Sequence, residues 1–158
     1  MASGKETGRR RRSHREPERG LQPLRIGIGW TVAHNGFYEL DPPRDWERDS
    51  ASLFFTEDML LLQNQQRRVL IDLSWMPYGP KGRFVLYATD WVGAPEMPYE
   101  WERPLLQVRT RSRERIVKTL DRWLDEHFDW SAAKQHHRQK SRRKMNVTTL
   151  QKLYESQQ

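Results

Sequence analysis

The stretch from Arg67 to Thr89 constrains the fold of this chain more than any other part of the sequence. Apolar side chains occupy every second position of its first half and so lie on one side of an extended strand: Val69, Ile71, Leu73 and Trp75. Residues 77–82 interrupt this pattern with two prolines and two glycines, which favour a loop. A second β-rich run extends from Phe84 to Thr89. The stretch predicts an antiparallel hairpin whose loop is longer than a tight turn.

Other segments are predicted to add strands to this pair. Asn35-Gly36 is the strongest short signal for a hairpin turn and would fold the segment Trp30–Leu40 back on itself. In that hairpin four residues share the core side: Trp30, Val32, His34 and Phe37. The segments Met59–Gln63 and Leu105–Thr110 are predicted to be further antiparallel strands. For Leu53–Phe55 the sequence leaves a short strand and a helical turn open.

One helix is predicted near the C-terminus, from Arg113 to Phe128. Its apolar residues form one stripe at helical spacing: Ile116, Val117, Leu120, Trp123, Leu124 and Phe128. Ser112 precedes the first turn and can cap it by accepting a backbone N–H bond. The predicted fold is therefore α+β, with an antiparallel sheet of five or six strands and the C-terminal helix packed on one face.

Charge divides the chain into three parts. Residues 1–22 are polar and Arg-rich, and are predicted to be a disordered tail before a single domain at 23–130. Residues 131–158 are predicted to be a second basic tail, with a candidate amphipathic helix around Val147–Tyr154. The formal net charge is +7, yet residues 26–130 hold thirteen basic and seventeen acidic residues. The basicity therefore lies in the tails, and the domain is expected to be mildly acidic.

The composition also bears on location. No apolar run approaches the roughly 20 residues that span a bilayer, and no apolar segment follows the Arg-rich N-terminus as in a secretory signal. The chain has no cysteine, which excludes disulfides and cysteine-ligated zinc and fits a reducing compartment. We expect a cytoplasmic protein without a membrane partner.

Few residues suggest catalysis. Gly27-Ile-Gly29 lacks the third glycine and the following helix of a dinucleotide-binding loop. His34 is a candidate general base if Asp41 or Asp72 orients it, but a packing role for this histidine is the more frequent case. Ser74 lies inside a strand pattern rather than at an exposed turn, so no nucleophile is marked. The expectation is a protein that is not an enzyme and has no cofactor.

A metal site is not predicted either. Glu57-Asp58 and the acids at positions 100 and 102 are more simply solvated side chains, because linear spacing does not make them converge. His136-His137 lies in a basic run with nothing to fix the two rings.

Binding is better supported. The sequence Tyr99-Glu100-Trp101-Glu102 alternates aromatic and acidic residues in a proline-bounded loop, as in the aromatic centre and polar rim of a protein interface. Packing against the core is the alternative for these rings. The basic runs would bind nucleic-acid phosphates without reading sequence, through Arg9, Arg10, Arg11, Arg12, Arg138, Lys140, Arg142, Arg143 and Lys144.

The layout resembles small bacterial domains of toxin–immunity systems. The resemblance is carried by Gly29-Trp30, Asn35-Gly-Phe37 and Asp41-Pro42, then by Ile71-Asp-Leu-Ser-Trp75 and the segment from Leu105 through the helix. It covers about residues 26–130, and the two basic tails depart from it. It implies a compact α+β protein that binds and blocks a toxin without catalysis, its acidic surface meeting a basic partner. The alternative is a nucleic-acid-associated protein that holds DNA or RNA through its tails, and a small hydrolase ranks last.

Overall fold

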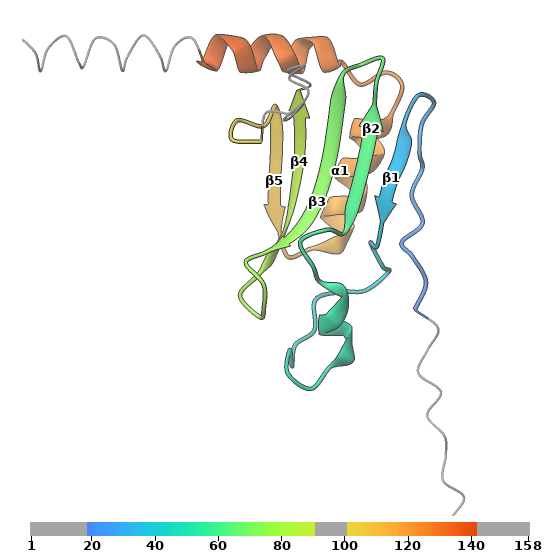
Figure 1. Cartoon of the computed structure of the whole chain (residues 1–158), viewed down its shortest axis with the longest axis vertical. Coiled ribbons are helices and arrows are strands. Elements are labelled where there is room, and N and C mark those ends of the chain that lie inside the picture. The colour runs from blue at the N-terminus through green and yellow to red at the C-terminus, as the bar shows by residue number, and fades with distance from the viewer. Residues whose placement is uncertain (1–18, 91–100, 142–158) are drawn as a thin grey trace, which may run out of the picture.

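The computed structural model describes residues 19–90 and 101–141. They form a five-stranded antiparallel sheet with a helix packed behind it and a second helix across its upper end (Figure 1). The elements are β1 (Thr31–Asn35), the 3-10 helix η1 (Ser50–Phe54), β2 (Leu60–Asn64), β3 (Val69–Met76), β4 (Arg83–Asp90), β5 (Leu106–Thr110) and α1 (Arg113–Leu124). Residues 130–141 are also helical. The predicted α+β fold is confirmed.

The strands follow one another across the sheet in chain order, each antiparallel to the next. The predicted central hairpin is β3 and β4, in which Ile71 lies opposite Ala88 and Trp75 opposite Phe84. The predicted strands at 59–63 and 105–110 are present as β2 and β5. The side of β3 that carries the alternating apolar residues faces α1. Ile71, Leu73 and Trp75 are fully buried on this side. The open question at 53–55 is settled by η1, which is helical.

Helix α1 begins where the sequence predicts it. The Ser112 hydroxyl accepts a hydrogen bond from the backbone N–H of Arg115 at 3.1 Å, which caps the first turn. The helix ends at Leu124 rather than Phe128, because Asp125 takes an extended conformation. The side chain of Arg67 donates to the carbonyls of Asp125 and Glu126, at 3.4 and 2.9 Å, beyond the end of the helix. The last four residues of the predicted helix thus lie outside α1.

The predicted hairpin at Asn35-Gly36 is wrong. Strand β1 pairs with β2 instead, with Asn35 opposite Leu60. A type I′ turn needs positive φ at both central residues, and neither Asn35 nor Gly36 has it. The Asn35 side chain accepts from the N–H of Phe37 at 3.1 Å, and Gly36 N–H donates to the Met59 carbonyl at 2.7 Å, so the chain leaves the strand here.

The predicted core face of that hairpin is therefore only half correct. Trp30 and Phe37 are buried, whereas Val32 is 45% exposed and His34 is exposed. Residue Tyr38 forms an isolated bridge with Leu21, near the start of the described chain.

The helix at 130–141 is attached to the upper end of the sheet. Its first residue, Trp130, is 4% exposed and packs against Trp30 and Trp123, with ring centroids 6.0 and 6.4 Å apart. The ammonium of Lys134 donates to the Asp90 carboxylate at 2.5 Å and to the carbonyl of Arg67 at 2.9 Å. Lys134, which the sequence placed in a basic tail, thus contacts the open end of the β3–β4 hairpin, where Val69 lies opposite Asp90.

The long loop between β3 and β4 closes over the ring of Trp75. The indole N–H donates to the carbonyl of Gly79 at 3.0 Å, and Gly79 has a positive φ of 102°. A Cβ at Gly82 would collide with the same indole, so only glycine fits there. Arg111 covers the outer side by donating to the carbonyls of Pro80 and Gly82, at 2.7 and 2.8 Å.

Candidate binding surfaces

The segment between β1 and β2, residues 39–58, forms a lobe at the lower end of the molecule (Figure 1). It carries seven acidic residues and two arginines, a net charge of −5, and we call it the acidic lobe. All seven acids are exposed: Glu39, Asp41, Asp45, Glu47, Asp49, Glu57 and Asp58. Arg113 pairs with Glu39 and Asp41, at 3.8 and 3.2 Å. Within the described chain, Glu47, Glu57 and Asp58 have no cation as partner, so their charge faces solvent.

The acidic lobe has a rigid base. Asp49 caps η1 by accepting from the N–H of Ala51 at 2.8 Å. Phe55, directly after η1, is 1% exposed and packs on Trp75 with ring centroids 4.9 Å apart. Trp46 stacks on Trp75 from the lobe, at 5.5 Å and an interplanar angle of 14°. The lobe is therefore tied to the core by aromatic contacts rather than by charge alone.

Two large apolar side chains are mostly exposed at this end of the molecule. Leu53, on η1, is 70% exposed, and Tyr78, in the β3–β4 loop, is 66% exposed. Met76 at the end of β3 adds a third, at 39%. The ring of Tyr78 meets Trp46 edge to face, with ring centroids 6.1 Å apart. Apolar groups held on a rigid base among acids are the composition of a protein interface.

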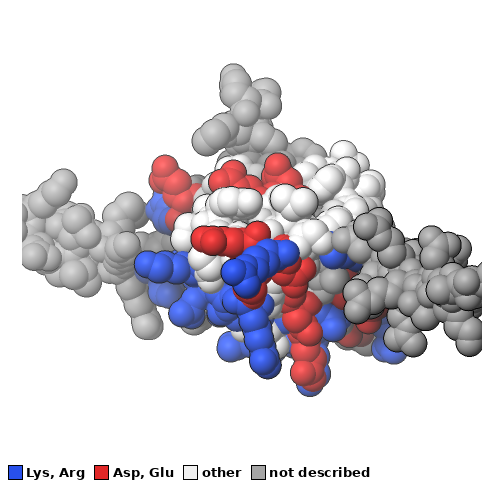
Figure 2. Space-filling view, turned by 90° about the horizontal axis from the view of Figure 1, so that it is seen from below, with Lys and Arg blue, Asp and Glu red and all other residues white. Residues whose placement is uncertain are grey.

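The opposite sign gathers on α1 and β5. Residues 103–122 hold seven basic and two acidic residues, a net charge of +5. Seen from the lower end, acidic side chains predominate in the upper part of the view and Lys and Arg in the lower part, where some acids run among them (Figure 2). The net charge of residues 26–130 predicted no basic face, because the charges of the acidic lobe and of the basic side of α1 cancel in that sum. Net charges taken over short windows of the sequence would have separated the two patches.

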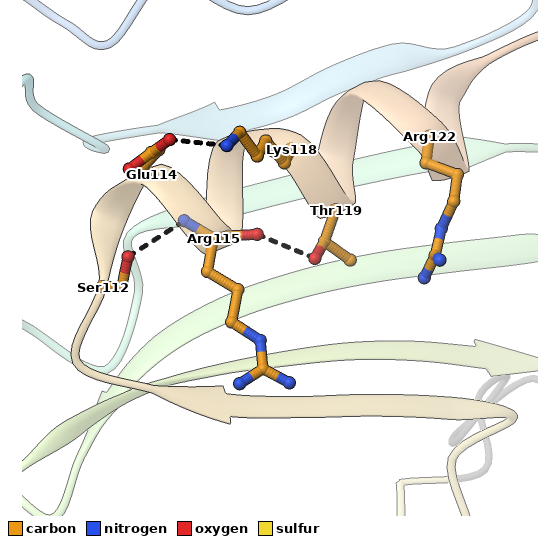
Figure 3. Close-up of a pocket in the computed structure, with 6 residues that line it drawn as sticks. All are labelled: Ser112, Glu114, Arg115, Lys118, Thr119 and Arg122. Atoms are coloured by element: carbon orange, nitrogen blue, oxygen red, sulfur yellow. Dashed lines mark hydrogen bonds and ion pairs between the residues drawn. The ribbon is translucent and has the colours of Figure 1, made fainter.

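A pocket of about 340 Å³ opens on the basic side of α1, and we call it the basic pocket. It is lined by Ser112, Glu114, Arg115, Lys118, Thr119 and Arg122. Arg115, Thr119 and Arg122 point toward the β5 side of the helix, and Glu114 and Lys118 toward the other side (Figure 3). Lys118 pairs with Glu114 at 2.6 Å, whereas no acid of the described chain pairs with Arg115 or Arg122.

The candidate catalytic residues do not come together. His34 Nε2 lies 3.0 Å from the Asp58 carbonyl, and Leu61 lies between His34 and Asp72 in the sheet register. Asp41 pairs with Arg113 instead. Asp72 accepts a hydrogen bond from the Ser74 hydroxyl at 2.9 Å, and burial raises the pKa of Asp72 to about 6 although that bond lowers it. A histidine one strand away from the carboxylate cannot be oriented by it.

Other predicted site residues fall partly outside the described residues. Of the proposed partner loop, Tyr99 and Glu100 lie outside them, while Trp101 is 41% exposed and Glu102 is exposed. Of the basic runs, Arg9–Arg12 and Arg142–Lys144 also lie outside. Arg138 and Lys140 are exposed on the helix at 130–141.

Within residues 19–90 and 101–141, no three His, Asp or Glu side chains gather so that they could hold a metal ion. None of the helices there is long and apolar enough to cross a bilayer.

No family model, no curated protein and no solved structure matches this chain.

Proposed function

We propose that this chain is a non-catalytic protein-binding domain whose acidic lobe receives a basic protein partner, as an immunity-type inhibitor receives a basic toxin. The observation that carries the proposal is the exposure of Leu53 and Tyr78, 70% and 66%, at the same end of the molecule as seven exposed acids. Large exposed apolar side chains among charges are the usual centre and rim of an interface.

The rigidity of this surface favours binding. Leu53 extends from η1, in which Ala51 and Ser52 are buried, and Tyr78 rests on Trp46. Side chains that are fixed before association lose less conformational entropy on binding than mobile ones. A partner would therefore bury two apolar groups that are already in place.

The charge of the lobe fits a basic partner. Glu47, Glu57 and Asp58 have no cation partner within the described chain and lie at the rim, where opposite charge accelerates encounter and contributes less to the lifetime of the complex. Salt should therefore slow association with a basic protein more than it accelerates dissociation.

The test is a selection from a displayed peptide or small-domain library against the immobilised full-length chain. The proposal predicts binders that are rich in Lys and Arg and that lose most of their affinity to Leu53→Ala and Tyr78→Ala. Glu57→Lys should weaken them further, while the matched change Asp121→Lys on the exposed surface of α1 should not. The proposal would be contradicted by binders whose affinity is unaffected by Leu53→Ala, Tyr78→Ala and Glu57→Lys, or by a selection that enriches acidic sequences alone.

A second candidate function is non-specific nucleic-acid binding. It is favoured by the helix at 130–141, in which residues 131–141 include Lys134, Arg138 and Lys140 and no acid. The test is DNA binding measured at several salt concentrations, because each phosphate contact on duplex DNA contributes a slope of about −0.9 in the log–log plot. Arg138→Ala with Lys140→Ala should lower that slope, and an unchanged slope would remove the candidate.

A further inference from the structure

Strand β5 is an edge of the sheet. It pairs with β4 and, in the part of the chain that is described, with no other strand. An edge strand presents unpaired N–H and C=O groups along one side, and an extended peptide can add to it as a further strand.

The side of β5 that faces α1 is incompletely covered. Leu106 and Val108 lie on this side and are only half buried, whereas Ala88 and Leu86, opposite them on β4, are fully buried. Helix α1 packs against both β4 and β5, yet Leu106 and Val108 keep part of their apolar surface accessible. An added strand would cover that surface with every second side chain.

The wall beside this surface is cationic. Arg115 and Arg122 point toward β5 from two positions seven residues apart on α1 (Figure 3). Two helical turns separate them by about 10 Å along the axis. Side chains on one face of an extended strand recur about every 7 Å, within reach of two flexible arginines at that spacing. Acidic side chains are the groups that guanidinium ions bind best.

We infer that the β5 edge and the basic pocket together bind an extended acidic peptide segment of a partner protein, which adds to the sheet as a sixth strand. Its apolar side chains cover Leu106 and Val108, and its carboxylates pair with Arg115 and Arg122. The remaining ends of this chain, residues 1–18 and 142–158, each carry a net charge of +3 and are repelled by this surface. Residues 91–100 carry a net charge of −2 but belong to the connection between β4 and β5, so charge excludes only the two ends of the chain. We take the occupant to be a segment of another protein. The inference does not depend on the acidic lobe.

The experiment uses the full-length chain and a labelled decapeptide of alternating Glu and Val, with the Lys–Val decapeptide as control. Fluorescence polarisation should show binding of the Glu–Val peptide alone, and hydrogen exchange should show new protection in β5. The double variant Arg115→Glu, Arg122→Glu should lower the affinity at least tenfold. The matched double variant Arg138→Glu, Lys140→Glu, with the same change in charge on the other helix, should lower it less than threefold.

Strand addition is separated from simple charge attraction by a Glu–Val peptide that is N-methylated at every second residue. Two such peptides exist, one methylated at the odd residues and one at the even residues. Each keeps its carboxylates but loses the N–H groups of one edge. The peptide that has lost the N–H groups facing β5 should bind at least tenfold more weakly. Equal binding of all methylated forms, no binding of the parent peptide at millimolar concentration, or unchanged protection of β5 would overturn the inference. If an equal concentration of single-stranded DNA displaced the peptide, the surface would be a site for nucleic-acid phosphates instead. If the chain associated with itself and Glu57→Lys abolished this association, the surface would bind a second copy of the chain instead.

Discussion

Lys134 and Asp90 form an ion pair that joins the helix at 130–141 to the end of β4. The ammonium and the carboxylate oxygen are 2.5 Å apart, and the two side chains are only 18% and 23% exposed. The same ammonium donates to the carbonyls of Arg67 and Arg68, at 2.9 and 3.1 Å. The helix is thereby fastened to the open end of the central hairpin, where β3 begins and β4 ends.

Lys134→Ala should lower the free energy of unfolding by about 2 kcal/mol, because it leaves a half-buried carboxylate without its charge-assisted hydrogen bond. Lys118→Ala is the control: its ion pair with Glu114 is 72% and 75% exposed, and such pairs contribute little. Urea denaturation of both variants measures the difference. A chain that ends at residue 130 should lose at least as much stability as Lys134→Ala, and equal stability of the trimmed and full chains would show that the helix is not attached.

Trp123→Ala should destabilise the domain by about 3–5 kcal/mol, because it empties a large site between α1 and the sheet. The side chain is 2% exposed and contacts Trp130 at 6.4 Å. Leu53→Ala, at a side chain 70% exposed, should change the melting temperature by no more than a degree or two. If both variants melted like the parent protein, α1 would not pack as described.

Asp72 should make stability depend on pH. Its pKa is raised by burial from 3.8 to about 6, so the folded chain holds this proton more tightly than the unfolded chain does. The stabilisation is complete below the lower value and is lost as the pH rises through the higher one.

Asp72→Asn removes the charge and leaves an oxygen for the Ser74 hydroxyl. It should stabilise the protein by up to about 3 kcal/mol at neutral pH, from about 1.4 kcal/mol for each pKa unit, and have no effect near pH 3. Asp121→Asn, on the exposed surface of α1, is the matched control. Denaturation curves at both pH values test this, and a gain that is independent of pH would count against it.

Trp101→Ala tests the partner loop predicted from the sequence. The ring is 41% exposed, so its removal should leave the melting temperature nearly unchanged. The loop leads into β5 at the end of the sheet opposite the acidic lobe, so affinity for binders selected on the lobe should be unchanged, and a loss of affinity would show that the partner also reaches this loop. A large loss of stability with unaltered affinity would place Trp101 in the core instead.

The local patterns that the sequence carries proved sufficient for the sheet centre and for α1. Period-two alternation identifies the side of β3 that meets the helix, although Leu70 and Ser74 on the other side are buried as well. Asn35-Gly36 misled because turn propensity is local, whereas the N–H of Gly36 is taken by the Met59 carbonyl, 23 positions further along the chain. Lys134 and Asp90 are also far apart in the sequence. The sequence around Lys134 is polar and basic, so it has no apolar periodicity from which the helix and its contact with Asp90 could be predicted.

The candidate surfaces were less predictable than the fold. The average charge of the domain concealed the acidic lobe and the basic side of α1, because the two cancel in a sum over residues 26–130. Leu53 and Tyr78 are apolar and would ordinarily be assigned to the core. Only the course of η1 and of the loop over Trp75 shows that both side chains point outward.

The acidic lobe is proposed to bind a basic protein, with Leu53 of the lobe and Tyr78 of the β3–β4 loop at the centre of the contact. The most direct measurement is a calorimetric titration of one selected basic binder into the parent chain, Leu53→Ala, Tyr78→Ala and the double variant, each accompanied by a thermal melt. We predict at least a tenfold loss of affinity in each single variant, as for a central interface side chain, with melting temperatures within about two degrees of the parent. Unchanged affinity in the double variant, with the fold intact, would contradict the claim.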